Sequence, residues 1–563
     1  MRPLLHIQNL SIDFETDNQT THAVRNISLK VDRGEILAIV GESGSGKSVT
    51  SLSVLQLLPK PPAKYSSGTI SFSENGKDAV ELISAGHQLI RQVRGHKIAM
   101  IFQEPMTSLN PVMTCSRQVM EALRVHKKIS RAEAKKQAID WFVKVKLPDP
   151  PAMFNRYPHQ LSGGQKQRVL IAMAMICNPS LLICDEPTTA LDVTVQKTIL
   201  ELIKELQVQE NMGVIFITHD LGVVAEIANR VAIMYKGEIV EENTAQAIFK
   251  DPRHPYTRAL IACRPAMHTR GERLPVVSDF LGNETPKSAP SGIQHKAGNT
   301  DILLEVKDLT VQFPVKTNLL GHATSYVKAV DHVSFEIFKG ETLGLVGESG
   351  CGKTTLGRTL LRLIDASSGS IMYNKKDITL YGREEMKKIR KDVQLIFQDP
   401  YSSLNPRLNI GAAIAEPMKV AGLELNDGQR RKKVKELLDK VNLSSTMLNR
   451  YPHEFSGGQR QRIVIARALA LSPDFLVCDE SVSALDVSVQ AQVLNLLNEL
   501  KKDLGLTMLF ISHDLSVVRY MSDRIMVMHK GEIVESGAAD EVYHHPRSTY
   551  TRSLIEAIPQ LSF

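Results

Sequence analysis

The sequence predicts an α/β protein that contains two copies of one domain. The chain has 563 residues, which is too long for one hydrophobic core and corresponds to roughly two to four domains. Long motifs of the first half return in the same order in the second half. Within each half, short runs of apolar, β-branched residues alternate with helical patterns, which is typical of α/β folds.

The repeats place the two copies in register. The loop lysines, Lys47 and Lys353, are 306 residues apart, whereas Gln103 and Gln398 are 295 apart, so the first copy has 11 additional residues between these positions. The repeated motifs are GESGSGKS and GESGCGKT (from Gly41 and Gly347), IFQEPMTSLNP and IFQDPYSSLNP (from Ile101 and Ile396), LLICDEPTTALD and FLVCDESVSALD (from Leu181 and Phe475), and FITHDL and FISHDL (from Phe216 and Phe510).

These repeats divide the chain into a first domain of residues 1–265, a linker of residues 266–300 and a second domain of residues 301–563. The linker is rich in Pro, Gly, Ser, Thr and charged residues and has no sustained periodicity. As a flexible coil, its 35 residues would span roughly 30–35 Å, which is enough for two domains to meet face to face.

The composition is that of an ordinary soluble globular protein, with 43% hydrophobic and 23% charged residues. The net charge of +7 comes without a long Lys/Arg run, so it does not indicate a nucleic-acid partner. No signal peptide is visible, and the longest apolar run, Val169–Cys177, is far shorter than the ~20 residues of a spanning helix. The six cysteines lack metal-ligand spacing, which predicts buried thiols in a reducing compartment.

In chain order, EILAIV (Glu35–Val40) predicts a buried strand, and Ser48–Leu58 has the apolar spacing of a helix. KIAMIF, LLICD and VIFIT are short bounded runs that predict further buried parallel strands. The stretch between Gln103 and Ser162 contains two helical patterns and no strand pattern. It therefore predicts a helical subdomain inserted into the α/β core.

The first repeated motif matches GxxxxGK[ST] between a strand and a helix, which is the context of a phosphate-binding loop. Its glycines allow backbone N–H groups to surround phosphate oxygens, Lys47 reaches the outer phosphates, and the Ser48 hydroxyl binds Mg²⁺. Both loops are predicted to bind ATP, through Gly41, Ser43, Gly44, Ser45, Gly46, Lys47, Ser48 and Val49, and through Gly347, Ser349, Gly350, Cys351, Gly352, Lys353, Thr354 and Thr355.

Two adjacent carboxylates end the LLICDE strand. Asp185 is placed to hold Mg²⁺, and Glu186 is free to accept a hydrogen bond from an attacking water as general base. Asp479 and Glu480 repeat the pair in the second copy. The predicted metal ligands of both copies are Ser48, Gln103, Asp185, Thr354, Gln398 and Asp479.

Two histidines, His219 and His513, follow apolar strands at the same distance from Glu186 and Glu480. Phosphoryl transfer requires donors to the γ-phosphate, and these histidines are predicted to supply one in each copy. Gln103 and Gln398 are predicted to contact the metal or the water, in addition to ATP.

The LSGGQ and FSGGQ motifs precede helices, so each predicts a second anion-binding helix start. One compact domain cannot easily hold one ATP with two such helices. We therefore expect the two domains to face each other head to tail, each capping the nucleotide bound by the loop lysine of the other. The capping residues are Ser162, Gly163, Gly164 and Gln165 in the first copy and Ser456, Gly457, Gly458 and Gln459 in the second.

These motifs resemble those of ATP-binding-cassette (ABC) transporter ATPases over nearly the whole chain except the linker. The resemblance implies two tandem P-loop NTPase domains, each with a RecA-like core, an antiparallel β subdomain and an inserted helical subdomain. It also implies MgATP hydrolysis and an aromatic residue that stacks on adenine, for which Phe14 and Phe313 are the candidates.

HPYTRAL (His254–Leu260) and HPRSTYTRSL (His545–Leu554) resemble the oligopeptide/dipeptide/nickel importer branch, and the layout is similar to single-chain ATPases of glutathione and microcin C uptake. The resemblance implies two integral membrane permease subunits and an extracytoplasmic solute-binding protein as partners. It implies a peripheral position at the cytoplasmic face of the inner membrane, peptide-like solutes, and no nucleic acid.

Two alternatives are a soluble tandem ABC ATPase that acts on ribosomes or DNA, and a transporter subunit that works as an exporter or regulator. The linker with Pro and Gly and the lack of zinc cysteines disfavour the first. One departure from the family pattern is Ser481-Val482, where Pro-Thr usually follows the Walker B glutamate, so the turn there is expected to be altered. A further hypothesis is that the phosphate loop lowers the pKa of the Cys351 thiol, so that alkylation blocks one site and MgATP protects it.

Overall fold

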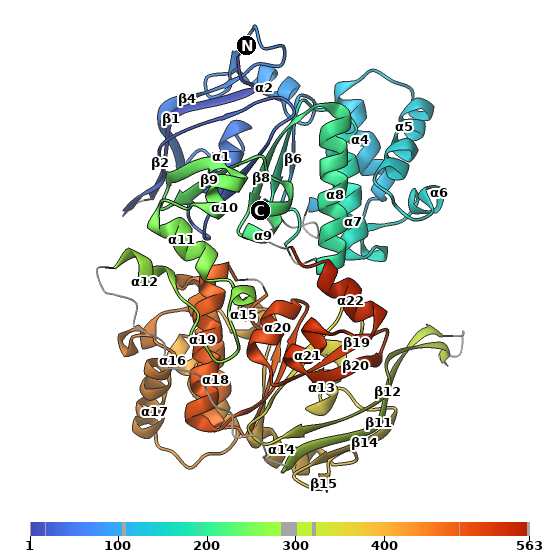
Figure 1. Ribbon diagram of the computed structural model, residues 1–563, viewed down its shortest axis with the longest axis vertical. Coiled ribbons are helices and arrows are strands. Elements are labelled where there is room, and N and C mark those ends of the chain that lie inside the picture. Colours follow the sequence, from blue (N-terminus) through green and yellow to red (C-terminus); the bar gives the residue numbers. More distant parts are fainter. Residues whose placement is uncertain are drawn as a thin grey trace. The chain divides into compact units, whose positions relative to one another are not determined.

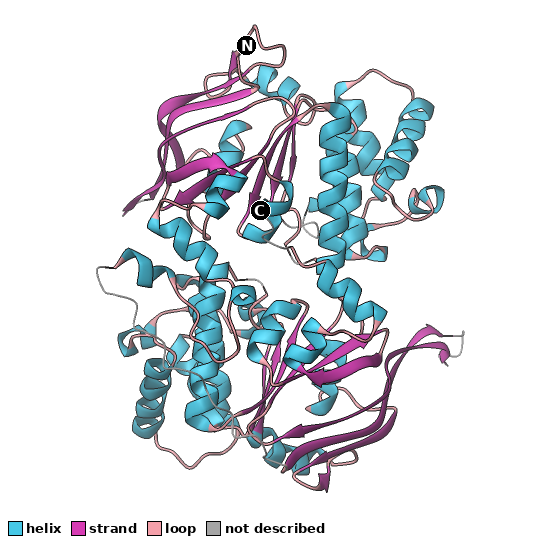
Figure 2. Cartoon of the chain, in the orientation of Figure 1, coloured by secondary structure: helices cyan, strands magenta, loops and turns pink. Residues whose placement is uncertain are grey.

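The structure, a computed structural model, describes residues 2–16, 19–103, 108–189, 191–282, 301–317, 323–483 and 485–559 (Figures 1 and 2). The chain divides into two compact units. The first consists mainly of Met1–Leu191 and Val195–Ile261, and the second mainly of Ala262–Ile558. The predicted fold class, two α/β domains in tandem, is confirmed.

The first unit begins with an antiparallel sheet in which apolar residues face one side. In β1, Leu5, Ile7, Leu10 and Ile12 are fully buried and their neighbours are more exposed. The register shifts between Ile7 and Leu10, where Asn9 has a φ of 48°, and this bulge returns Leu10 to the buried face. The strand order is β2-β1-β4-β5, formed by β1 (Leu5–Thr16), β2 (Gln19–Val31), β4 (Ala63–Phe72) and β5 (Val80–Glu81).

The core of the first unit is a six-stranded sheet of order β10-β9-β3-β8-β7-β6, in which only β10 is antiparallel to its neighbour. All residues of β3, β7 and β8 are buried, which explains their continuous apolar sequences. The strands are β3 (Ile36–Val40), β6 (Ile98–Ile101), β7 (Leu181–Asp185), β8 (Gly213–Thr218), β9 (Arg230–Tyr235) and β10 (Glu238–Thr244).

Helices surround this sheet and form the predicted helical subdomain (Figure 1). Between Gln103 and Ser162 the described residues contain helices and no strand, as the sequence predicts. The helices are α1 (Lys47–Val54), α2 (His87–Val93), α4 (Cys115–His126), α5 (Arg131–Lys144), α6 (Pro150–Met153), α7 (Gly163–Met175), α8 (Val193–Glu210), α9 (Leu221–Ile227), α10 (Ala245–Lys250) and α11 (Pro255–Ala262). None of the described helices is long and apolar enough to cross a membrane.

The second unit repeats this topology, with sheets of order β12-β11-β14-β15 and β16-β17-β18-β13-β19-β20. Its strands are β11 (Ile302–Thr317), β12 (Ala323–Phe338), β13 (Thr342–Val346), β14 (Ser368–Tyr373), β15 (Lys376–Asp377), β16 (Val393–Ile396), β17 (Phe475–Asp479), β18 (Thr507–Ser512), β19 (Arg524–His529) and β20 (Glu532–Ala538). Its helices are α13 (Lys353–Leu360), α14 (Arg383–Asp392), α15 (Pro400–Ser403), α16 (Ile410–Val420), α17 (Asp427–Lys440), α18 (Gly457–Ala468), α19 (Val487–Leu504), α20 (Leu515–Met521), α21 (Ala539–His544) and α22 (Thr549–Glu556).

The additional residues of the first copy lengthen one strand and the loop after it. Leu5 lies opposite Phe72 and Leu304 lies opposite Tyr373, so β4 and β14 end at matching positions. However, β4 has 10 residues and β14 has 6. The first unit thus has a longer β4 beside β1, and a longer loop between β4 and β5 than between β14 and β15.

The described part of the interdomain segment differs from the expected flexible coil. Residues up to Gly282 contain a 3-10 turn (Pro265–Met267) and helix α12 (Val277–Leu281), and Leu274 is completely buried. Apolar residues within a sequence rich in polar residues pack against the second unit and order this part. Residues 283–300 lie outside the described residues.

Candidate active site

The phosphate loop of each unit joins the first core strand to a helix, β3 to α1 and β13 to α13. Gly46 and Gly352 cap these helices with φ of 101° and 111°. A Cβ atom would lie 2.6 Å from the Ala23 carbonyl oxygen at Gly46 and 2.0 Å from that of Ala329 at Gly352. Only glycine fits there, which explains these positions of the motif.

The loop lysines are buried and lie over their own loops. Lys47 Nζ donates to the carbonyl oxygens of Gly41 and Glu42 at 2.8 and 2.9 Å. Lys353 Nζ donates to those of Gly347 and Glu348 at 2.7 and 2.9 Å. The ammonium groups are therefore held at the mouth of each loop, where phosphates of a nucleotide would take over as partners.

A hydroxyl and a carboxylate meet beside each loop. Ser48 Oγ donates to Asp185 Oδ1 at 3.1 Å, and Thr354 Oγ1 donates to Asp479 Oδ1 at 2.9 Å. These are hard oxygen donors of the kind that Mg²⁺ prefers, so the residues fit the predicted metal. Burial and the neighbouring Glu186 charge raise the pKa of Asp185 to about 6 against the Ser48 hydrogen bond, and a bound cation would favour its charged form.

Glu186 lies at the centre of a hydrogen-bonded cluster formed by loops after three core strands. Its Oε2 accepts from Gln103 Nε2 at 3.1 Å and Thr189 Oγ1 at 3.0 Å, and lies 3.4 Å from His219 Nδ1. Burial raises the pKa of this carboxyl, but His219 and Lys47 lower it by more, so that the net pKa is about 2. Glu186 is therefore ionised at neutral pH and able to accept a proton-bearing partner.

The second unit builds the same cluster with one difference. Glu480 accepts from Gln398 Nε2 at 2.7 Å and lies 3.6 Å from His513 Nδ1. Ser483, which corresponds to Thr189, instead donates to the Glu480 main-chain carbonyl at 2.8 Å. Both Glu186 and Glu480 have a φ of 47°, so the backbone at the glutamate is not altered by the substitution that follows it.

The SGGQ motifs begin helices α7 and α18. Ser162 Oγ accepts from the Gln165 backbone N–H at 3.3 Å, and the Gln165 side chain accepts from the Ser162 N–H at 3.1 Å. Ser456 and Gln459 form the same capping box. That each motif caps the nucleotide of the other domain stays a prediction.

The two glycines of this motif have different roles in packing. A Cβ at Gly164 would lie 2.5 Å from Val195 Cγ1, and one at Gly458 would lie 2.2 Å from Val489 Cγ1. At Gly457, by contrast, a Cβ would meet nothing within 4 Å. The second glycine therefore allows two helices to approach, and the first one leaves the helix start open.

The candidate adenine-stacking residues lie on the outer sheets. Phe14, in β1, is partly buried against the core of the first unit, and Phe313, in β11, is 41% exposed. Their role remains a prediction. Part of the QEPMTSLNP motif (residues 104–107) and two residues of the ALD motifs, Ala190 and Ala484, lie outside the described residues.

The hypothesis that the phosphate loop activates Cys351 is wrong for the protein without nucleotide. Burial raises the pKa of its thiol more than the nearby Lys353 charge and backbone lower it, and the residue is only 8% exposed. All six cysteines lie within the described residues, each is buried, and none forms a disulfide, as their spacing predicts.

Two tyrosines, not identified as site residues from the sequence, support the phosphate loops. The Glu42 N–H donates to Tyr256 Oη at 3.1 Å, and the Glu348 N–H donates to Tyr550 Oη at 3.1 Å. Both tyrosines belong to the repeated HPYT-type tails, and Tyr256 is completely buried. The recurrence of Tyr-Thr-Arg in both tails was the available signal.

Comparisons with known proteins agree with this geometry. The profile of the ABC transporter family matches residues 24–189 and 330–483. The profile described as the C-terminal region of oligopeptide/dipeptide transporters matches residues 240–285 and 534–563. Both matches confirm the resemblance drawn from the motifs.

The chain is similar to curated relatives over almost its entire length. It is 49% identical over 558 residues to the glutathione import ATP-binding protein GsiA of Escherichia coli, covering 99% of this chain and 89% of the relative. It is 48% identical over 560 residues to the protein of the same name from Salmonella choleraesuis, covering 99% and 90%. A solved dimeric ATP-binding cassette with ADP and Pi is 27% identical, with a TM-score of 0.38, over 42% of this chain and 98% of that chain.

Proposed function

The chain belongs to the ABC transporter family, and from this premise we propose that it is the ATP-hydrolysing subunit of an importer for glutathione or a similar short peptide. The observation that carries the proposal is the presence of two complete sets of site residues in a chain 48–49% identical to glutathione import ATP-binding proteins. Both copies keep the loop lysine, the paired carboxylates and the histidine.

In each unit the side chains have separate roles in hydrolysis. Lys47 and Lys353 neutralise charge on the outer phosphates, while Glu186 and Glu480 accept a hydrogen bond from the attacking water. His219 and His513, whose Nδ1 atoms lie 3.4 and 3.6 Å from these glutamates, would each donate a hydrogen bond to the γ-phosphate. A bound Mg²⁺ would offset phosphate charge beside Ser48 and Asp185, and beside Thr354 and Asp479.

Coupling to transport rests on sharing each nucleotide between the domains. The helix starts at Ser162 and Ser456 would contact the nucleotide held by Lys353 and Lys47, respectively, and hydrolysis would release this contact. Shifting such an equilibrium from 1:99 to 99:1 requires that the nucleotides favour the closed state by ~5.5 kcal/mol.

The permeases would dock in hollows beside the helical subdomains, which lie at different positions in the two units. In the first unit, a hollow of about 720 Å³ lies between α2 and the end of α4, lined in part by Leu89, Val93 and Val125. In the second unit, a hollow of about 230 Å³ is lined by Leu363 and Phe397, among others. Phe397 directly precedes Gln398, which donates to Glu480, so a docked permease segment would be one residue from the site.

The glutamates provide the test of two active sites. We expect Glu186→Gln and Glu480→Gln each to lose the ATPase activity of its own site, since removing a general base costs typically about 10²–10⁴-fold there. Binding of MgATP should be retained, because neither residue is a predicted ligand. Exposed acids in the helical subdomains, changed as Glu121→Gln and Glu436→Gln, serve as matched controls.

Full activity in either glutamate variant would contradict the claim that both sites hydrolyse ATP. Uptake of glutathione into vesicles that contain the permeases would test the solute and the direction, and so separate import from export. Co-purification with the permeases would separate both from a soluble protein acting on ribosomes or DNA, a reading that the comparisons do not favour.

A further inference from the structure

The segment that follows the last helix of the first unit is part of the second unit. Helix α11 ends at Ala262, and the residues from Ala262 onward belong to the second unit. We define residues 264–281 as the docking segment. It contains the Pro265–Met267 turn and helix α12, and the turn packs on α20.

The second unit holds the main chain of this segment through two side chains. Asn495 Oδ1 accepts from the Leu274 N–H at 2.9 Å, and Asn495 Nδ2 donates to the Leu274 carbonyl at 2.8 Å. Tyr520 Oη donates to the Glu272 carbonyl at 2.6 Å. The Leu274 side chain is completely buried, so the site combines main-chain recognition with an apolar anchor.

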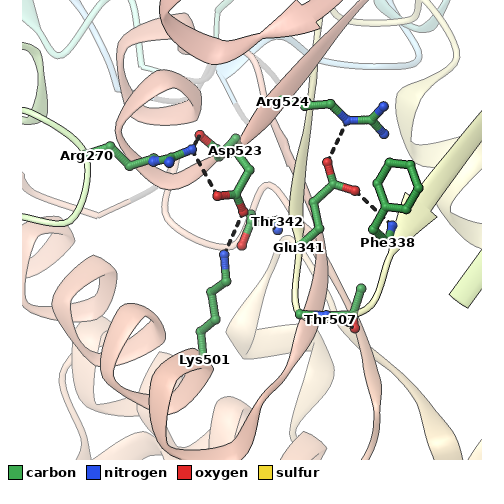
Figure 3. Close-up of polar contacts among 10 residues, drawn as sticks. Arg270, Phe338, Glu341, Thr342, Lys501, Thr507, Asp523 and Arg524 are labelled. Atoms are coloured by element: carbon green, nitrogen blue, oxygen red, sulfur yellow. Dashed lines mark hydrogen bonds and ion pairs between the residues drawn. The ribbon is translucent and has the colours of Figure 1, made fainter. Parts of the chain in front are cut away.

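A cluster of charges completes the site (Figure 3). Arg270 Nη1 lies 2.9 Å from Asp523 Oδ1 and donates to the Ser522 carbonyl at 3.2 Å. On the other side, Asp523 Oδ2 accepts from Lys501 Nζ and from the Thr342 N–H, both at 2.8 Å. Asp523 thus joins the docking segment to α19 and to the first core strand.

Figure 3 also shows a neighbouring pair that both copies share. Glu341 accepts from Arg524 Nε at 2.6 Å, and the first unit has the same pair in Glu35 and Arg230 at 2.7 Å. This part belongs to the common fold and is not evidence of docking.

The residues that contact the docking segment, and Lys501, which pairs with Asp523, are different in the first copy. Asn229 stands where the second copy has Asp523. Its Oδ1 accepts from the Ile36 N–H at 2.8 Å, as Asp523 accepts from the Thr342 N–H, but Asn229 carries no charge. Glu201 and Gln207 stand in place of Asn495 and Lys501, and Glu226 in place of Tyr520. The docking residues are therefore a property of the second copy alone.

We propose that residues 264–281 are an intrachain docking segment whose partner surface is formed by Asn495, Tyr520 and Asp523 of the second unit, with Asp523 held in place by Lys501. The segment connects the two units directly at Ala262 and holds them together without ATP. Gly282 and Asp301, which flank residues 283–300, both belong to the second unit, so residues 283–300 are not needed as the connection. This inference does not depend on which solute is transported or on whether both sites hydrolyse ATP.

The test cuts the full-length protein within residues 283–300. A specific protease site is inserted between residues 288 and 296, and the purified, nucleotide-free protein is cleaved and passed over a size-exclusion column. We expect the two fragments to elute together, because the docking segment remains attached to the first unit and bound to the second. Separation of the fragments would overturn the proposal.

A matched variant replaces docking residues by those that the first copy carries, Asn495→Glu, Lys501→Gln and Asp523→Asn. These residues are compatible with the fold because the first unit contains them at the same positions. After cleavage this variant should separate into two fragments, whereas Arg430→Gln, which breaks an exposed ion pair on α17, should not. Fragments of the triple variant that still elute together would overturn the proposal.

A second measurement does not require a substitution. A synthetic peptide of residues 262–283, added in large excess to the cleaved wild-type protein, should displace the first fragment. A peptide of the same composition in scrambled order is the control. No release at equilibrium, or equal release by both peptides, would contradict recognition of this segment.

Discussion

At the scale of single residues, His513 forms a charged pair with the Glu480 carboxylate in the second site. Burial lowers the pKa of this histidine, but the hydrogen bond and charge of Glu480 raise it more, so the net pKa lies above its ordinary value. The stabilisation from the charged pair is therefore complete below the unfolded pKa of about 6.5 and is lost as the pH rises through the folded pKa. An NMR titration of the histidine ring signals should give a pKa above 6.5 for His513. The Glu480→Gln variant should show a lower pKa for His513.

Cys351 lies in a phosphate loop, a position that predicts a reactive thiol, but its burial makes the thiol unreactive. Burial raises the pKa of the thiol, so little thiolate exists at neutral pH. We expect iodoacetamide at pH 7.5 to modify Cys351 at least about tenfold more slowly than free cysteine, as measured by peptide mass spectrometry. Rapid modification of this residue in the folded protein would contradict the prediction.

At the scale of elements, the C-terminal tail of each copy supports its own phosphate loop. Tyr256→Phe or Tyr550→Phe removes the acceptor of a loop N–H and leaves the ring in place. A lost hydrogen bond of about 1 kcal/mol corresponds to roughly fivefold weaker ATP binding at that site, measurable with a fluorescent nucleotide. Tyr326→Phe, at an exposed tyrosine of β12, should leave binding unchanged.

The two glycines at the start of α18 differ in packing, because only Gly458 lies against another side chain. Gly458→Ala places a Cβ 2.2 Å from Val489, so it should destabilise the second unit by about 1–3 kcal/mol, and Val489→Ala in the same protein should restore most of this loss. Gly457→Ala should leave stability unchanged, because nothing lies within 4 Å. Thermal unfolding of the three variants measures the difference. Equal destabilisation by both alanines would show that the helix start is packed differently.

At the scale of the whole molecule, the sequence predicts most of the architecture because the chain contains the same unit twice. The strands at Glu35–Val40 and LLICD, the helical insertion, and the clusters around Glu186 and Glu480 were identified from repeated motifs with clear physical roles. Repetition also explains what was missed. The docking segment binds side chains that the first copy lacks, and its order depends on Leu274, Arg270 and their partners more than 200 residues away, which no local pattern indicates. The burial of Cys351 likewise depends on tertiary packing.

Because the docking segment binds residues of the second unit, the place at which the gene is divided matters. A stop and restart of translation anywhere within codons 283–300 would yield two polypeptides. The N-terminal polypeptide would then end in the docking segment, which binds the C-terminal polypeptide. The same interruption ahead of codon 262 would place the docking segment on the C-terminal polypeptide. The N-terminal polypeptide would then lack this segment, and the two would have to associate without it. The position of the break, rather than the loss of covalent continuity itself, would decide whether a divided gene still makes a paired protein.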